Sequence, residues 1–285
     1  VLADYSIARH YPDSAQAENR YLAFLQSVVK AQAELIAHWM SLGFIHGVMN
    51  TDNTAISGET IDYGPCAFMD TFHPQCVFSS IDRGARYAWG NQAEIGLWNL
   101  TRFAETLLPL ISNSSEKAIE LAEASLSGFA ELFGNAYSQR FRNKFGLSED
   151  ASFDVVSDGL NLMAEHKVDF TIFFRELTKV AHGKGSERLL GLFNHAPSFQ
   201  VWLVDWQKRG DGIAELESMR SSNPVRIPRN HRVEQAIQAA YREDYGVAET
   251  LVETLTNPYD DDLGFSDFEL PPSEAEMVRE TFCGT

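Results

Sequence analysis

Apolar residues recur at helical spacing near the start of this 285-residue chain, over residues 14–42. The apolar positions are Leu22, Leu25, Val28, Val29, Leu35, Ile36, Trp39 and Met40. Residues spaced three and four apart lie on one face of a helix. Asp13 and Ser14 supply a capping side chain before this run, and Gly43 is a residue that readily ends a helix. The pattern therefore predicts a long helix over 14–42 whose apolar stripe packs into a core.

Most of the remaining chain has the same periodicity, interrupted by Gly and Pro. It predicts helices near 92–111, 115–144, 153–165, 168–181, 197–208, 211–220, 231–243 and 247–256. A loop punctuated by Gly and Pro, from Tyr63 to Gly90, precedes them. We therefore expect a mainly α fold.

One short segment, residues 53–62, has a different pattern. The residues on either side of Ser57-Gly58 are typical of two short strands joined by a two-residue turn. That turn would place Asn53 directly opposite Asp62, with their Cβ atoms roughly 4.5–5.5 Å apart. An amide oxygen beside a carboxylate suits Mg²⁺ that carries substrate phosphates. The sequence thus predicts a small β-hairpin with a metal site at its open end.

The residues around this hairpin follow the spacing of the catalytic motifs of protein kinases. A kinase has H-R-D-x-x-x-x-N followed by D-F-G, and here His46 precedes Asn53 by seven residues and Asp62 begins D-Y-G. The position of the kinase base is occupied by Val48, however, and the nearby carboxylate is Asp52. We expect His46, which has apolar neighbours, to orient the loop rather than to react.

A longer set of motifs resembles one family. These are HGVMNTDN and TIDYGP, then Arg86-Tyr87, Asn91-Gln92 and WNLTR at 98–102, then Asn223-Pro224, IPRNHRVE at 227–234, Pro271-Pro272 and TFCGT at 281–285. Together they span most of the chain and are similar to the selenoprotein O (YdiU) family, whose members have a kinase fold. The resemblance implies a protein-kinase-like C-lobe with the small hairpin at the metal site and a helical C-terminal extension.

The resemblance also implies an activity. Members of the family bind ATP in a reversed orientation and transfer AMP to Ser, Thr or Tyr hydroxyls of proteins. Carried over by position, Asp52 would accept the proton, Asn53 and Asp62 would bind Mg²⁺ (or Mn²⁺), and Asp62 would also lie near the nucleotide. The same residues leave two alternatives open: a phosphate-transferring kinase, and a non-catalytic pseudokinase scaffold. Val48, in place of the catalytic Asp of a kinase, supports the scaffold, and the retained pair Asn53 and Asp62 counts against it.

Composition limits the classes of partner and the cellular location that we expect. The formal net charge is −17, which disfavours nucleic acid because its phosphates would be repelled. The sequence contains no apolar run of the roughly 18–20 residues that a membrane span needs. The three cysteines, Cys66, Cys76 and Cys283, have no zinc-ligand spacing and predict a reducing compartment. We expect the cytoplasm for a bacterial protein, or the mitochondrion for a eukaryotic one.

Cys283 matches the redox-active cysteine or selenocysteine of the family by position, although neither Cys66 nor Cys76 clearly matches its partner. Residues 257–276 contain seven acidic residues and no basic one, which is consistent either with an extended strap packed on the domain or with disorder. We predict three regions: a kinase-like C-lobe over 1–190, a helical extension over 191–256, and an acidic tail over 257–285. The chain has no Gly-rich phosphate loop before His46, so we expect it to be a fragment that is inactive alone.

Overall fold

The computed structural model describes residues 1–209, 213–261 and 266–282. Its α-helices are α1 (Leu2–His10), α2 (Arg20–Leu42), α3 (Gln92–Ile111), α4 (Ser115–Ser127), α5 (Phe129–Phe145), α6 (Asp154–His166), α7 (Phe170–Ala181), α8 (Glu187–Leu192), α9 (Pro197–Gln207), α10 (Ile213–Ser222), α11 (Asn230–Ala240) and α12 (Gly246–Thr256). Short 3₁₀ helices cover Pro12–Gln16, Thr51–Asn53, Trp89–Asn91 and Ser266–Glu269. Strands β1 (Phe44–Ile45) and β2 (Ala67–Phe68) pair antiparallel. The prediction of a mainly α fold with a small antiparallel sheet is confirmed.

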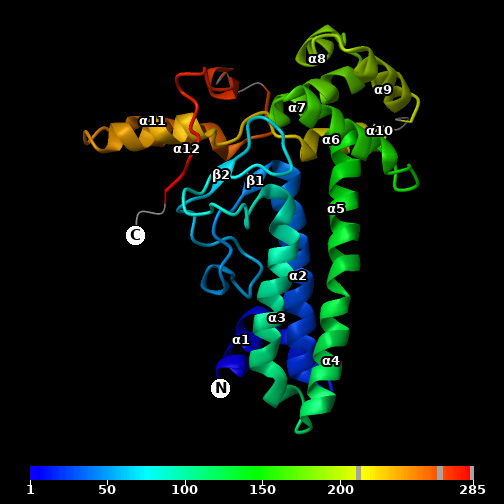
Figure 1. Cartoon of the computed structure of the whole chain (residues 1–285), viewed down its shortest axis with the longest axis vertical. Helices are drawn as coiled ribbons and strands as arrows, with labels where there is room; N and C mark the ends of the chain where they lie inside the picture. Colours follow the sequence, from blue (N-terminus) through cyan, green and yellow to red (C-terminus); the bar gives the residue numbers. More distant parts are fainter. Residues whose placement is uncertain (210–212, 262–265, 283–285) are drawn as a thin grey trace.

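Three long helices form the body of the molecule. α2 packs against both α3 and α5, and the three run side by side in Figure 1, with α4 at one end and α6 to α10 at the other. The apolar stripe predicted for α2 is buried, as Leu25 and Ile36 show with no exposed surface. No helix in the described part of the chain is long and apolar enough to span a membrane.

The long helix α2 begins later than the sequence predicts. Asn19, rather than Asp13 or Ser14, caps it, because the Asn19 side chain accepts a hydrogen bond from the Leu22 amide at 3.1 Å. Pro12–Gln16 forms a separate 3₁₀ turn. The predicted end is confirmed: Gly43 has φ of 72°, a left-handed conformation that glycine adopts without steric cost. Gly43 thus turns the chain directly into β1.

Other predicted boundaries shift in the same way. The single helix expected over 115–144 is two helices, α4 and α5, which meet at Gly128. Six helices match their predictions closely: α3, α6, α7, α9, α11 and α12. The sequence pattern predicts no separate helix for α1 or for the six-residue α8. Rings at the end of the molecule opposite α4 pack tightly, with the Phe145 and Phe174 centroids 5.0 Å apart.

The acidic tail packs back on the domain, so the strap is the correct alternative for its described residues. Arg175 on α7 forms ion pairs with Asp261, at 2.8 Å, and with Glu269. Further along, the Thr281 amide donates to the Phe78 carbonyl at 2.7 Å, and the Ser80 amide donates to the Thr281 carbonyl at 3.0 Å. The strap therefore adds backbone pairing to the loop that follows the candidate site. Cys283 lies outside the described residues.

Candidate active site

The candidate residues lie in one loop, residues 46–66, whose ends are joined by the β1–β2 pair. Phe44 pairs with Phe68 and Ile45 with Ala67. At the base of the loop Gly47 approaches Pro65 so closely that a Cβ would lie 2.7 Å from the Pro65 carbonyl oxygen, and its φ is 85°. Only glycine fits both constraints. The loop is thus closed at its base by backbone contact.

His46 holds the far side of the loop. Its Nε2 lies 2.8 Å from the Ile61 carbonyl oxygen, and because a carbonyl can only accept, Nε2 carries the proton. The ring is buried and packs against Trp39, with centroids 5.4 Å apart. Burial lowers the pKa of His46, which keeps the imidazole neutral. His46 therefore orients the loop, as its apolar neighbours predict.

The strands predicted over 53–62 are not formed. Groups of this segment bond instead to side chains on α2: the Ala55 carbonyl accepts from Gln32 at 2.6 Å, and the Thr60 hydroxyl accepts from the Trp39 indole at 2.8 Å. The turn is centred one residue earlier than predicted, since the Gly58 amide donates to the Ala55 carbonyl at 3.1 Å. The small sheet lies at the ends of the loop rather than within it.

Two amide side chains on α3 form hydrogen bonds to β1 and to the loop. Gln92, with no exposed surface, accepts from the His46 amide at 3.1 Å and donates to the Phe44 carbonyl at 3.0 Å. Asn99 donates to the Met49 carbonyl at 2.9 Å and to the Thr54 hydroxyl at 3.1 Å. In this way α3 fixes β1 and the residues on both sides of Asp52 and Asn53.

Asp52 and Asn53 occupy the 3₁₀ turn Thr51–Asn53. Asp52 is exposed, and Val48, at the position of a kinase base, is 7% exposed within the core. The Asn53 Nδ2 donates to the Val48 carbonyl at 3.1 Å. That bond fixes the amide by its nitrogen and leaves Oδ1 as the atom available to a ligand.

Asp62 follows the Ile61 carbonyl that His46 binds. It is exposed and has φ of 55°, a left-handed conformation that is uncommon except for glycine and is enriched in Asn and Asp. Its carboxylate accepts a long, 3.5 Å hydrogen bond from the Gly64 amide. Strained backbone of this kind is concentrated at functional sites. The structure places Asp62 in the same loop as Asp52 and Asn53, but the hairpin pairing expected to set it opposite Asn53 is absent.

The donor set fits a magnesium ion bound together with a nucleotide. Mg²⁺ is usually held by one or two protein oxygens plus substrate phosphates and waters. Asn53 Oδ1 and the exposed Asp62 carboxylate are hard oxygen donors of that kind. Within residues 1–209, 213–261 and 266–282 no group of three His, Cys, Asp or Glu side chains could hold a metal by itself. The loop therefore suits a shared protein–phosphate site.

The segment that follows the loop is hydrogen-bonded to it. Tyr87 donates from its hydroxyl to Asn50 Oδ1 at 2.7 Å, and Asp82 accepts from the Tyr87 amide at 2.8 Å. Cys66 and Cys76 are both free thiols in this region, and burial raises the pKa of each to about 11. Both are therefore protonated thiols at neutral pH.

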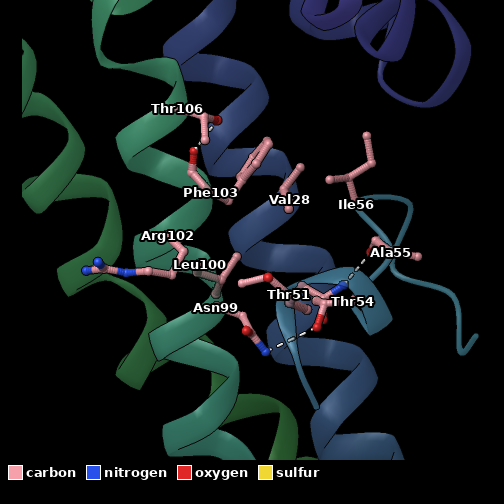
Figure 2. Close-up of a pocket in the computed structure, with 11 residues that line it drawn as sticks. Val28, Thr51, Thr54, Ala55, Ile56, Asn99, Leu100, Arg102, Phe103 and Thr106 are labelled. Carbon is pink, nitrogen blue, oxygen red and sulfur yellow. Dashed lines mark hydrogen bonds between the residues drawn. The ribbon is translucent and has the colours of Figure 1, made fainter. Parts of the chain in front are cut away.

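A cavity opens beside the loop, on the side of Thr51 (Figure 2). It has a volume of about 300 Å³ and lies between α2, residues 51–56 and α3. Its walls are mostly apolar, with Val28, Ile56 and Leu100 among them. The cavity thus adjoins the 3₁₀ turn that carries Asp52.

Sequence reasoning assigns no role to Gln92, Asn99 and Tyr87, although all three fall in the motifs quoted above. One signal was present: Gln92 and Asn99 are seven residues apart, so they share the buried face of an otherwise apolar helix. Buried amides need hydrogen-bond partners, and the loop supplies them.

Comparison with known proteins identifies the family of this chain. The model of the family described as "Protein adenylyltransferase SelO" matches residues 1–256. "Protein nucleotidyltransferase YdiU" of Nitrobacter hamburgensis is 49% identical over 293 residues, covering 100% of the chain and 58% of the relative. Its namesakes in Methylorubrum populi and a strain of Rhodopseudomonas palustris are 49% and 50% identical, each covering 100% of the chain and 60% of the relative. The chain belongs to the SelO family. It spans about three fifths of the length of these curated relatives.

Proposed function

We propose that this chain provides the metal-binding and acceptor-activating part of a protein adenylyltransferase. The observation that carries the proposal is which positions of the loop hold an exposed carboxylate and an available amide oxygen. The position of a kinase base is the buried Val48, whereas an exposed carboxylate, Asp52, precedes an amide whose oxygen is free to bind a ligand. Family membership and the names of the relatives support nucleotidyl transfer to proteins as the reaction.

In this proposal Asp52 accepts the proton of a Ser, Thr or Tyr hydroxyl. The hydroxyl oxygen forms a bond to the α-phosphorus of ATP, the bond from that phosphorus to the bridging oxygen breaks, and pyrophosphate leaves. Mg²⁺ bound at the site would neutralise phosphate charge. Asn53 Oδ1 and the Asp62 carboxylate are the oxygens that would hold it.

Positioning by the rest of the fold is part of the proposal. His46 fixes the backbone before Asp62, and Asn99 fixes the residues on either side of the turn that carries Asp52. Phosphoryl-type transfers depend mainly on positioning and on charge stabilisation. The exposed acids are therefore presented by a rigid support.

The test compares two labels. The full-length gene product is incubated with Mg²⁺, a protein mixture and ATP labelled on the α- or the γ-phosphate. We expect label on protein only from α-labelled ATP, and loss of that label in Asp52→Asn and Asp62→Asn. Label only from the γ-phosphate would make the protein a kinase, and no label from either, with Mg-ATP still bound, would favour a scaffold.

A further inference from the structure

The carbonyl oxygen of Pro65 is a point at which three separate segments of the chain meet. A Cβ at Gly47 would lie 2.7 Å from this oxygen, so the backbone that follows β1 lies directly against it. From the other end of the chain, the Thr281 Oγ1 donates a hydrogen bond to the same oxygen at 2.5 Å. Pro65 is buried and comes three residues after Asp62. The C-terminal strap therefore contacts the candidate active-site loop close to one of its proposed metal ligands.

The Asp62 carboxylate is positioned by the backbone on its two sides. On the N-terminal side, His46 holds the Ile61 carbonyl at 2.8 Å. Asp62 is exposed, and its own hydrogen bond within the loop is long, at 3.5 Å. On the C-terminal side, the Pro65 carbonyl is the first group after Asp62 that accepts a hydrogen bond from outside the loop, among the residues that the structure describes. Thr281 thus anchors one side of Asp62 as His46 anchors the other.

Thr281 is itself held in place by backbone hydrogen bonds. Its amide donates to the Phe78 carbonyl at 2.7 Å, and its carbonyl accepts from the Ser80 amide at 3.0 Å. Through these bonds it pairs with Ser79 as an isolated parallel bridge. The side chain takes no part in this pairing, so the hydroxyl is available to Pro65. The hydroxyl accordingly links the loop that follows the candidate site to the base of the site.

Contacts along the strap bring Thr281 to this position. Glu269 pairs with Arg175 on α7, and Glu276 accepts a hydrogen bond from Gln235 on α11 at 3.3 Å. Figure 1 shows the strap, in red, passing α11 before the chain ends. The strap is thus attached to two helices before its last described residues reach the loop.

We propose that Thr281 is a positioning residue of the metal site: by holding the Pro65 carbonyl, its hydroxyl keeps the Asp62 carboxylate where it can bind the metal ion. This inference rests on the proposed function, because it assigns a further residue to the same site. Thr281 itself touches neither metal nor nucleotide in this assignment, and it acts through Asp62.

The test measures metal binding by the full-length gene product without relying on catalysis. Mn²⁺ is titrated into the protein together with α,β-methylene-ATP, and free Mn²⁺ is followed by electron paramagnetic resonance. Thr281→Val removes the hydroxyl and keeps the branched shape, whereas Thr281→Ser keeps the hydroxyl. Thr250→Val is the matched control, because the Thr250 Oγ1 donates to the Gly246 carbonyl of its own helix, α12, at 2.8 Å.

We expect Thr281→Val to weaken Mn²⁺ binding about tenfold, the size of effect that follows when a buried carbonyl loses its hydrogen-bond partner. Thr281→Ser and Thr250→Val should bind Mn²⁺ as wild type does. With α-labelled ATP, Thr281→Val should also raise the KM for Mg-ATP. Adding Thr281→Val to Asp62→Asn should weaken binding no further, because residues that act through one group are not additive.

Three results would overturn the inference. Unchanged Mn²⁺ binding in Thr281→Val would show that the hydroxyl does not position the site, and an equal loss in Thr281→Ser would show that the hydroxyl is not the cause. A further loss in the Asp62→Asn background would show that Thr281 acts on the fold rather than through Asp62. If wild type binds Mn²⁺ with the analogue but transfers no α-label to protein, the proposed function fails, and the binding data still decide the role of Thr281.

Discussion

The Nε2 of His46 donates a hydrogen bond to the carbonyl oxygen of Ile61, 2.8 Å away. The contact joins the residue after β1 to the residue before Asp62, so it spans the candidate site. Because the imidazole is buried and neutral, it acts as a fixed donor to the loop. The position of the Asp62 carboxylate therefore depends on a side chain that does not itself need to react.

Replacing this donor should loosen the loop. His46→Leu leaves the Ile61 carbonyl without its partner, and we expect a loss of about 1–3 kcal/mol in the free energy of unfolding, together with reduced label transfer. His46→Gln keeps an N–H and should lose less of both. Urea unfolding and the α-label assay measure the two effects, and equal losses in the two variants would show that the hydrogen bond is unimportant.

The metal-binding role of the Asp62 carboxylate can be tested without disturbing the backbone conformation at this position. Asp62 has φ of 55°, a conformation that Asn also tolerates. We expect Asp62→Asn to abolish Mg²⁺-dependent nucleotide turnover while the melting temperature stays near wild type, and Asn53→Ala to weaken turnover strongly.

Glu59→Ala is the matched control for charge. Glu59 is an exposed acid of the same loop and accepts a hydrogen bond from the Ser57 hydroxyl at 2.7 Å. Turnover in Glu59→Ala should remain near wild type. Near-normal turnover in Asp62→Asn would remove the metal role from Asp62.

Arg229 joins two parts of the fold through two acids. It is 1% exposed, pairs with Asp70 just after β2, and donates to Asp169, the N-cap of α7, at 2.8 Å. Burial raises the pKa of Asp70 in spite of the guanidinium. Removing one member of a buried ionic group strands the others, at a cost of about 3–5 kcal/mol.

Arg229→Met should therefore lower the free energy of unfolding by about that amount. The control is Arg209→Met, because Arg209 forms an exposed pair with Asp205 at 2.7 Å one helical turn away. The control should lose less than about 1 kcal/mol. Denaturant unfolding of both proteins checks this, and a small loss in Arg229→Met would mean that Asp70 and Asp169 are stable without the cation.

The sequence predicted the elements that a local signal determines. Helix periodicity located α3 over Gln92–Ile111, and Gly43 located the end of α2, because spacing and the left-handed preference of glycine act within one turn. Gly128 was missed as a break because it lies in an αR conformation between two helices.

The candidate site was predicted in part. The sequence identified Asp52, Asn53 and Asp62 as candidates, and their roles remain predictions. It was wrong about the hairpin, because the local pattern of residues 54–61 favours strands while Gln32 and Trp39 on α2 take up their hydrogen-bonding groups. Those partners are more than twenty residues away along the chain, so no local pattern reveals them. The cavity likewise depends on α2 and α3 meeting the loop.

Lys144 near the end of α5 is a buried cation that forms no ion pair with any acidic residue that the structure describes. Its Nζ donates to the Ser222 carbonyl at 3.2 Å and lies 4.1 Å from the centre of the Phe174 ring. Burial lowers the pKa of Lys144 from 10.5 to about 7. Folding therefore works against the charged form of this side chain.

The sign of the pH effect follows from that shift. Between about pH 7 and pH 10.5 the unfolded chain binds a proton at Lys144 that the folded chain has released, so this group makes the free energy of unfolding rise with pH in that window. Lys144→Met removes the titration, and its stability relative to wild type should fall as pH rises from 7 to 9. Lys30→Met, at a side chain that is 64% exposed and pairs with Glu34, should differ from wild type by a constant amount. Urea unfolding at intervals across this range measures both differences. A constant difference for Lys144→Met would mean that Lys144 keeps an ordinary pKa in the folded protein, held charged by the Phe174 ring and the Ser222 carbonyl.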